Sequence, residues 1–245
     1  MMSYVIEQRL MAGLPNKTLI AVKYVIAHES GNAKNNGPNT IENEIAFMNR
    51  NKENAFTSHW VGGGGRIIQV APVNKVQYGC GAKGNPYSYA QVELARTSDK
   101  EQFKKDYAAY IWLLRKLAKD AGVPIVLDGS GNGIKSHQWI TNNLGGTTHV
   151  DPYSYLQSMG ISEVQFKKDI ENGMNNDLKE LQKNEKGDDK MKFISPTTKE
   201  AVRELLKQAV DKKLINKLWL EKFDNEKLLI GDFEGLKILI KQRNE

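Results

Sequence analysis

A polar, highly charged run divides this chain, and it constrains the fold more than any other feature of the sequence. Residues 174–192 read MNNDLKELQKNEKGDDKMK, a stretch without aromatic residues, and such a composition is typical of a linker. The chain has 245 residues, enough for one domain with a substantial core and a small appendage. We therefore expect a first domain over residues 1–173, the linker over 174–192, and a small second domain over 193–245.

Composition excludes several classes of protein. Hydrophobic residues make up 40% of the chain and charged residues 26%, as in globular proteins, and the sequence contains no apolar run long enough for membrane insertion. Cys80 is the single cysteine, so an internal disulfide and a multi-cysteine zinc site are both impossible. A metal site must therefore use His, Asp or Glu. The net charge of +6 favours a polyanionic partner, for which nucleic acid, anionic lipid and cell-wall teichoic acid all qualify.

Strand patterns dominate the first part of the chain. Residues 24–28 (YVIAH) form an apolar run typical of a buried strand, and a helix follows behind Asn39, with Glu42 as its capping-box partner. Four glycines between two β-prone runs in residues 58–70 (SHWVGGGGRIIQV) predict a hairpin, and residues 89–95 (YAQVELA) predict another strand.

Helical patterns become frequent after these strands. A long amphipathic helix is expected from Ser98, with Glu101 three residues on, and Gly122 ends it. A shorter helix is expected from Ser162, whose capping-box partner is Gln165. The first domain is therefore predicted to be α/β.

The segment after the linker has only helical patterns. Thr197 and Glu200 predict the start of a helix, and two further apolar clusters, around Trp219 and Phe233, follow it. The patterns therefore predict a small all-α module of about three helices. Its many lysines fit an anionic wall polymer and solvated helix faces equally well, and exposed apolar residues such as Trp219 would also suit a homodimer interface.

The segment SHQWITNNLGGTTHVDP, residues 136–152, contains two of the four histidines in the chain. We expect His137 in a short strand-like stretch, and the glycine turn after it can return His149 and Asp151 over the end of that strand. Zinc hydrolases use three His or carboxylate ligands and keep a fourth position for water. His28, at the end of the first predicted strand, together with His137 and one of His149 or Asp151, satisfies this count.

Other conspicuous residues have plainer interpretations. His28 alone would more often be structural, and His59, before the glycine hairpin, is expected to be structural or to line a substrate site. Gly62–Gly65 do not make a nucleotide-binding loop, because no strand-to-helix pattern or Lys-Ser/Thr ending accompanies them. Cys80 has no partner motif, so a small packed residue is expected there.

Four segments, in order, carry a family resemblance. YVIAHES, TSHWVGGGGRIIQVAP, YAQVELA and KSHQWITNNLGGTTHVDP resemble type-2 N-acetylmuramoyl-L-alanine amidases, the zinc peptidoglycan amidases related to peptidoglycan-recognition proteins. The resemblance covers roughly residues 1–173 and implies a mixed central sheet flanked by helices. It also implies a Zn²⁺ ion held by His28, His137 and Asp151.

The same resemblance assigns two catalytic residues. Glu93, in YAQVELA, matches the family's proton-handling glutamate, although without the resemblance it would be interpreted as a solvent-exposed carboxylate. His149, two residues before the last ligand, matches the residue that stabilises the oxyanion. Two departures stand out: Ser58 replaces a tyrosine that some phage members place before the hairpin histidine, and Gly79 with Cys80 replaces a histidine or similar residue after the hairpin.

The resemblance implies an enzyme that hydrolyses the amide bond between N-acetylmuramic acid and L-alanine in bacterial peptidoglycan. An amidase followed by a linker and a small module is the layout of phage or prophage endolysins. We expect synthesis in the host cytoplasm without a signal peptide, release to the cell wall, and anchoring there by residues 193–245. The alternatives are a non-catalytic peptidoglycan-binding relative and a basic nucleic-acid-binding protein, but the first domain shows neither a basic recognition helix nor an aromatic platform.

Overall fold

The structure, a computed structural model, describes residues 4–174, 195–228 and 230–244. The chain divides into two compact units, residues 1–175 and 176–245. The predicted linker, residues 174–192, lies outside the described residues except for Met174.

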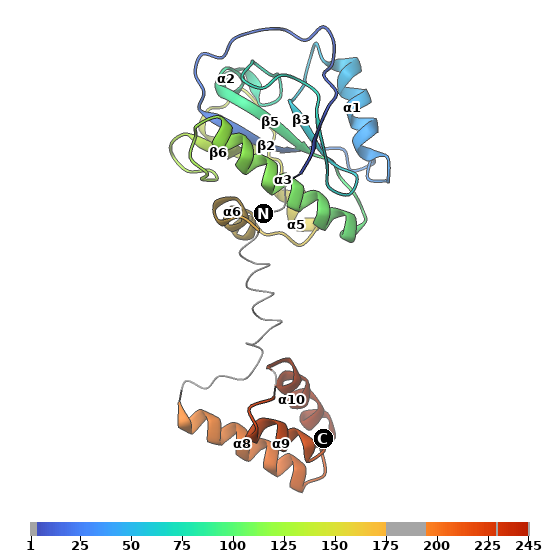
Figure 1. Cartoon of the computed structure of the whole chain (residues 1–245), viewed down its shortest axis with the longest axis vertical. Helices are drawn as coiled ribbons and strands as arrows, with labels where there is room; N and C mark the ends of the chain where they lie inside the picture. The colour runs from blue at the N-terminus through green and yellow to red at the C-terminus, as the bar shows by residue number, and fades with distance from the viewer. Residues whose placement is uncertain (1–3, 175–194, 229, 245) are drawn as a thin grey trace. The chain divides into compact units, whose positions relative to one another are not determined.

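A six-stranded mixed sheet organises the first unit (Figure 1). Its strands are β1 (Ile6–Gln8), β2 (Tyr24–Glu29), β3 (His59–Gly62), β4 (Arg66–Gln69), β5 (Ser88–Leu94) and β6 (Gly133–Ser136). The strand order is β1-β4-β3-β5-β2-β6. β3 and β4 pair antiparallel as the predicted glycine hairpin, and the other neighbouring pairs are parallel. The mixed sheet confirms the predicted fold class.

Helices flank this sheet. They are α1 (Thr40–Asn51), α2 (Gly81–Gly84), the short 3₁₀ helix η1 (Asn85–Tyr87), α3 (Lys100–Asp120), α4 (His137–Asn143), α5 (Tyr153–Ser158) and α6 (Glu163–Asn172). The long helix α3 lies along one face of the sheet in Figure 1, against β2, β3 and β5. β1, α2 and α5 were not predicted, because each is short and has little periodicity.

The two faces of the sheet bury different side chains, because successive residues in a strand point to opposite sides. Val25 and Ala27 of β2, with Val92 and Leu94 of β5, belong to the core cluster that includes α3. The intervening residues of both strands must then face away from α3. The alternation therefore places His28, Gln91 and Glu93 together on the face opposite α3.

The predicted helix starts were partly wrong. Asn39 precedes α1 but its side chain makes no capping hydrogen bond, because its backbone (φ −100°, ψ 14°) is not in the extended conformation of a capping residue. Glu42, the predicted capping-box partner, is engaged elsewhere. Asp99, not Ser98, caps α3, because the backbone remains extended through Asp99, whose carboxylate accepts from the amides of the first turn. Ser162 caps α6 as predicted, by accepting from the Gln165 amide.

Glu42 instead forms ion pairs with Arg9 and Arg66. Its carboxylate lies 2.6 Å from Nη1 of Arg9 and 2.9 Å from Nη1 of Arg66. These contacts join α1 to the segment after β1 and to the start of β4. The two guanidinium groups, Arg9 first, lower the pKa of Glu42 to about 2 despite the opposing effect of burial.

The second unit contains the helices α8 (Pro196–Asp211), α9 (Leu218–Asp224) and α10 (Ile230–Asn244). An apolar cluster joins them, and its buried members are Leu206, Ala209, Ile215, Phe223, Leu228, Phe233 and Leu236. The first helix begins earlier than predicted: Ser195 caps it and Pro196 occupies its first turn, where a missing N–H costs nothing. Within the described residues, none of the helices combines the length and apolar character that a membrane span requires.

Candidate metal centre

Three potential metal ligands meet where β2 ends. His28, His137 and Asp151 each offer a ligand atom, and these atoms lie within 4.8 Å of one another. His28 and Glu93 are partners in the parallel register of β2 and β5, as are Ile26 and Gln91. The sheet therefore brings Glu93 alongside the ligand cluster.

His137 reaches the cluster from a helix rather than from a strand. β6 ends at Ser136, whose hydroxyl accepts from the Trp139 amide and so caps α4, making His137 the first residue of that helix. The predicted strand-like placement of His137 was wrong by one residue, because a serine cap ends the strand there. The segment before Asp151 runs back beside α4: the Gln138 amide donates to the carbonyl of Asp151.

Asp128 links the segments that carry these two ligands. Its Oδ1 accepts from the backbone N–H of Ser136 at 2.7 Å, and its Oδ2 accepts from the Ser136 hydroxyl at 2.7 Å and from the Tyr153 hydroxyl. Ser136 precedes His137, and Tyr153 lies two residues after Asp151. One carboxylate thus fixes the position of both segments.

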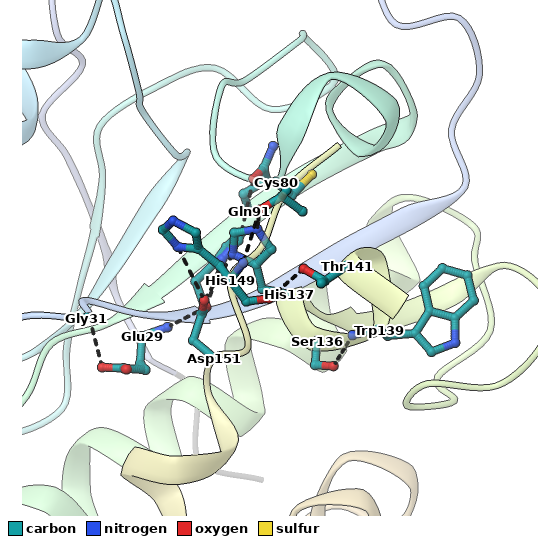
Figure 2. Close-up of polar contacts among 12 residues, drawn as sticks. Glu29, Gly31, Cys80, Gln91, Ser136, His137, Trp139, Thr141, His149 and Asp151 are labelled. Atoms are coloured by element: carbon teal, nitrogen blue, oxygen red, sulfur yellow. Dashed lines mark hydrogen bonds and ion pairs between the residues drawn. The ribbon is translucent and has the colours of Figure 1, made fainter. Parts of the chain in front are cut away.

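Hydrogen bonds orient both imidazoles so that Nδ1 faces Asp151. Nδ1 of His28 lies 3.1 Å from Oδ2 of Asp151, and Nδ1 of His137 lies 3.0 Å from Oδ1. Nε2 of His28 contacts Oε1 of Gln91 at 3.0 Å, and Nε2 of His137 contacts Oγ1 of Thr147 at 2.9 Å. Figure 2 shows the Asp151 carboxylate pointing toward the imidazoles.

Gln91 determines the tautomer of His28. Its amide nitrogen donates to the carbonyl of Gln77 and to Oδ1 of Asn85, so its oxygen must face His28 and accept from Nε2–H. When the Nδ1 proton that faces Asp151 is released, Nδ1 holds the lone pair that a metal needs. A Cβ at Gly79 would lie 2.3 Å from this oxygen, so the glycine that departs from the family pattern provides the room that Gln91 occupies.

The cluster stabilises positive charge. Burial lowers the pKa of His28, but the hydrogen bond to Asp151 and the nearby Glu93 carboxylate outweigh it and raise this pKa to about 9. Burial raises the pKa of Asp151, yet its contacts with His137 and His28 hold it well below its ordinary value. Burial likewise lowers the pKa of His137. A metal cation would supply positive charge at the same place, and its binding would release the proton of His28.

Glu93 is a half-buried carboxylate with an unsatisfied oxygen. Oε2 is buried and has no hydrogen-bond partner among the described residues. Burial, more than any other cause, raises the pKa of Glu93 to about 8, although the neighbouring His28 opposes the shift. An unpaired buried oxygen is costly. A structural carboxylate would have acquired a partner, so this oxygen is suited to act on a water or substrate.

His149 lies at the exposed edge of the cluster. Its side chain is 72% exposed, its ring stacks on that of His137 with centroids 4.9 Å apart, and Nδ1 lies 3.9 Å from Oδ1 of Asp151. It is therefore outside the group of three ligand atoms but beside it. Of the alternatives open at the sequence level, the geometry favours Asp151 over His149 as the third ligand.

A groove of about 1120 Å³ opens at His137 and His149. Its lining residues are Lys17, Thr18, Ile20, Asn54, Ala55, Val76, Tyr78, Gly79, Gly81, Ala82, Asn85, Pro86, His137, Gly146, Thr147, Thr148 and His149. Gly81 and Gly146 pack closely here: a Cβ at Gly81, where φ is +79°, would lie 2.5 Å from the Gly146 carbonyl oxygen. Only glycine permits these two loops to meet along the groove.

His59 and Cys80 are structural. His59 pairs in register with Val92, on the α3 face, and burial together with Lys116 of α3 lowers its pKa to about 3. It therefore lines no part of the metal centre, and the substrate-lining alternative is excluded. Cys80 is fully buried, and burial raises the pKa of its thiol to about 12, as expected for a small packed residue.

Sequence reasoning missed Gln91, Thr147 and Asp128. Gln91 lies two residues before Glu93 on the same strand, so a period of two would have indicated that the residues share a face. Thr147 and Asp128 gave no such signal, because their contacts depend on where three separate segments meet.

Comparisons with known proteins agree with this site. The sequence pattern of the N-acetylmuramoyl-L-alanine amidase family matches residues 18–154, more than half of the chain. The chain therefore belongs to this family, which confirms the predicted resemblance.

Relatives and a solved structure support the assignment. An endolysin of Listeria phage A511 is 54% identical over 174 residues, which cover 69% of this chain and 50% of the relative. A lytic amidase of Streptococcus pneumoniae phage HB-3 is 45% identical over 173 residues, covering 69% and 53%. The chain thus matches about half the length of these relatives. The hydrolase AmiA of Staphylococcus aureus, solved with its ligand, aligns with a TM-score of 0.65 at 26% identity over 73% of this chain and 87% of that one.

Proposed function

We propose that this protein hydrolyses the amide bond between N-acetylmuramic acid and L-alanine in bacterial peptidoglycan, with a Zn²⁺ ion held by His28, His137 and Asp151. The observation that carries the proposal is the position of Glu93, whose unpaired carboxylate oxygen lies beside three convergent metal ligands. The family membership and the two phage relatives support the same reaction.

The donor set suits zinc. Two imidazole nitrogens and one carboxylate oxygen match the ligands of catalytic zinc sites, which keep a further position open. A zinc ion at such a site polarises the amide carbonyl and lowers the pKa of the attacking water. Gln91 and Thr147 would act as supporting residues, by fixing the imidazole orientations from behind.

Glu93 moves the proton. Its carboxylate takes the proton from the attacking water and returns it to the nitrogen of the departing L-alanine, acting as base and then as acid. A pKa raised to about 8 by burial is suited to both halves of this exchange near neutral pH. The absence of a hydrogen bond to Oε2 among the described residues leaves that oxygen available.

His149 stabilises the oxyanion. The tetrahedral intermediate places negative charge on the former carbonyl oxygen, and an imidazole N–H directed at that oxygen lowers the barrier. His149 is exposed at the groove and stacked on a metal ligand, so it can reach a substrate that lies there.

The second unit anchors the enzyme to the cell wall after release from the host cytoplasm. Lys207, Lys212 and Lys213 are exposed on α8 and the turn after it, and no described carboxylate forms an ion pair with them. Three free cations within seven positions suit an anionic wall polymer. Cosedimentation of the full chain with walls stripped of teichoic acid, compared with intact walls and with the triple Lys→Gln variant, tests this role; sedimentation equilibrium tests the dimer alternative.

The catalytic proposal is tested by zinc content and by release of L-alanine amino termini from purified walls. Asp151→Asn should lose both zinc and activity. Glu93→Gln should keep its zinc and lose about 10²- to 10⁴-fold in rate, the usual contribution of acid–base catalysis. The matched control is Asp106→Asn, which changes a buried carboxylate on α3 outside the site. This variant should keep both its zinc and its activity.

Two other outcomes would contradict the proposal. Zinc binding and wall binding without new amino termini would identify a non-catalytic peptidoglycan-binding relative. Release of reducing sugars or of internal peptide ends would show that the enzyme breaks another bond.

A further inference from the structure

The groove beside the metal centre has an unusual charge balance. None of the residues that line it is acidic, and its polar lining consists of threonines, asparagines, two histidines, one tyrosine and one lysine. A substrate cut at the metal centre must place its peptide part or its sugar part along this groove. The charges of the residues that line the groove therefore influence which substrates the enzyme accepts.

Lys17 is the lysine of this groove, and its position is fixed by the backbone. Its carbonyl accepts from the Val76 amide at 2.9 Å, and the next residue, Thr18, forms a bridge with Lys75. Its Nζ lies 5.4 Å from the ring centroid of Tyr78, another lining residue. No carboxylate in the described part of the chain forms an ion pair with Lys17, so its charge is available to a ligand.

A neighbouring hollow has the same sign of charge. It has a volume of about 550 Å³ and shares Ile20, Ala82 and Pro86 with the groove. Lys23 and Lys83 line it, again without an acidic residue. Lysines without acidic neighbours around two adjoining hollows create a positive potential that attracts and orients an anionic ligand.

We propose that Lys17 is a specificity-determining residue, which pairs with a carboxylate of the stem peptide and makes the enzyme prefer acidic stem peptides to amidated ones. This inference rests on the proposed amidase function and adds the charge of the preferred substrate. Two carboxylates of the substrate class qualify: the α-carboxylate of D-glutamate at the second position, and the side-chain carboxylate of diaminopimelate at the third.

Pairs of defined muramyl peptides test the preference. The first pair is N-acetylmuramoyl-L-alanyl-D-glutamate and its α-carboxamide. The second pair carries D-isoglutamine at the second position and diaminopimelate or its side-chain amide at the third. Each pair differs by a single carboxylate, so kcat/KM within a pair isolates one charge, and the pair that shows the preference identifies which carboxylate is bound.

The full-length wild type should prefer the acid in one pair by about threefold to fivefold, the effect of one exposed ion pair. Lys17→Gln should abolish this preference by lowering kcat/KM for the acid to about the value for the amide, and Lys17→Glu should reverse it. Lys34→Gln, which removes an exposed lysine outside the groove, should keep it. Added salt should reduce the wild-type preference.

Equal rates within both pairs, or a preference that survives in Lys17→Gln, would overturn the inference and leave the amidase function intact. Failure to cleave any of the four peptides would instead count against the proposed function. Calorimetric binding of the same peptides to full-length Glu93→Gln, with and without Lys17→Gln, still measures the charge preference in that case. Equal affinities within each pair for Glu93→Gln would overturn the inference independently of turnover.

Discussion

Replacing Asp128 should weaken metal binding, although Asp128 is not a ligand. Its carboxylate accepts three hydrogen bonds, two from Ser136 and one from Tyr153. Asp128→Ala removes them all and leaves the Ser136 amide without its acceptor. Alanine is also disfavoured at the positive φ of 53° that Asp128 adopts.

The magnitude follows from these contacts. Hydrogen bonds to a charged acceptor contribute about 1.5–3 kcal/mol each when buried. Because Asp128 is half-buried, we take a value below the full sum and expect the free energy of unfolding to fall by about 4 kcal/mol. Loss of such supporting contacts typically weakens metal binding about 10- to 100-fold. Asp128→Asn keeps one acceptor oxygen and tolerates the positive φ, so its effects should be smaller.

The assay combines zinc affinity, from competition with a chromophoric chelator, with urea unfolding of the metal-free protein. Asp106→Ala is the matched control, because Asp106 accepts from the backbone amides of Gly64 and Gly65 in the hairpin. It should lose stability while keeping its zinc affinity. If Asp128→Ala bound zinc as tightly as the wild type while losing stability, Asp128 would be a structural residue without influence on the ligands.

Three further predictions concern the scaffold. Gly81→Ala should lower the free energy of unfolding by about 2–3 kcal/mol, measured by urea unfolding, because its backbone is left-handed and its Cβ would meet a carbonyl oxygen of the facing loop. Glu42→Gln should cost about 0.5 kcal/mol at pH 7, given the exposure of its ion pairs with Arg9 and Arg66. Because the native pKa of Glu42 is lowered to about 2, this stabilisation is present above pH ~4.5 and is lost as the pH falls through 2. If Glu42→Gln were still less stable than the wild type by the same amount at pH 2, the ion-pair explanation would be wrong. His59 has a native pKa of about 3, whereas in the unfolded chain it takes up a proton below pH ~6.5. The free energy of unfolding should therefore fall by about 2 kcal/mol between pH 6.5 and 5. The His59→Asn variant should show a shallower decline over the same range.

Local patterns were sufficient for much of the fold. The apolar run that ends at His28, the glycine hairpin and the long helix ending before Gly122 were all predicted, because each has a strong periodicity or a glycine at a turn. The precise helix starts were not predictable in the same way. Several polar residues precede each helix, and only the backbone dihedral angles decide that Asp99 rather than Ser98 is the cap.

The sequence by itself determined which residues could take part in the chemistry. With one cysteine and four histidines, few metal-ligand sets were possible, and the family resemblance carried by four short motifs implied His28, His137 and Asp151 as ligands, with Glu93 and His149 as catalytic residues. Tertiary structure alone decided how these residues are held. The tautomer of His28 depends on Gln91, both ligand segments depend on Asp128, and His59 is separated from the centre by the sheet.

The physical reason is that hydrogen-bond partners, burial and charge balance come from segments that are distant in sequence and leave no periodic signal. Glu93 looked like a surface carboxylate when judged from its strand alone. Only the folded sheet, which places it beside His28 with a buried and unpaired oxygen, gives it a raised pKa. Lys17 likewise was one exposed lysine among many until the fold placed it on a groove without acidic residues.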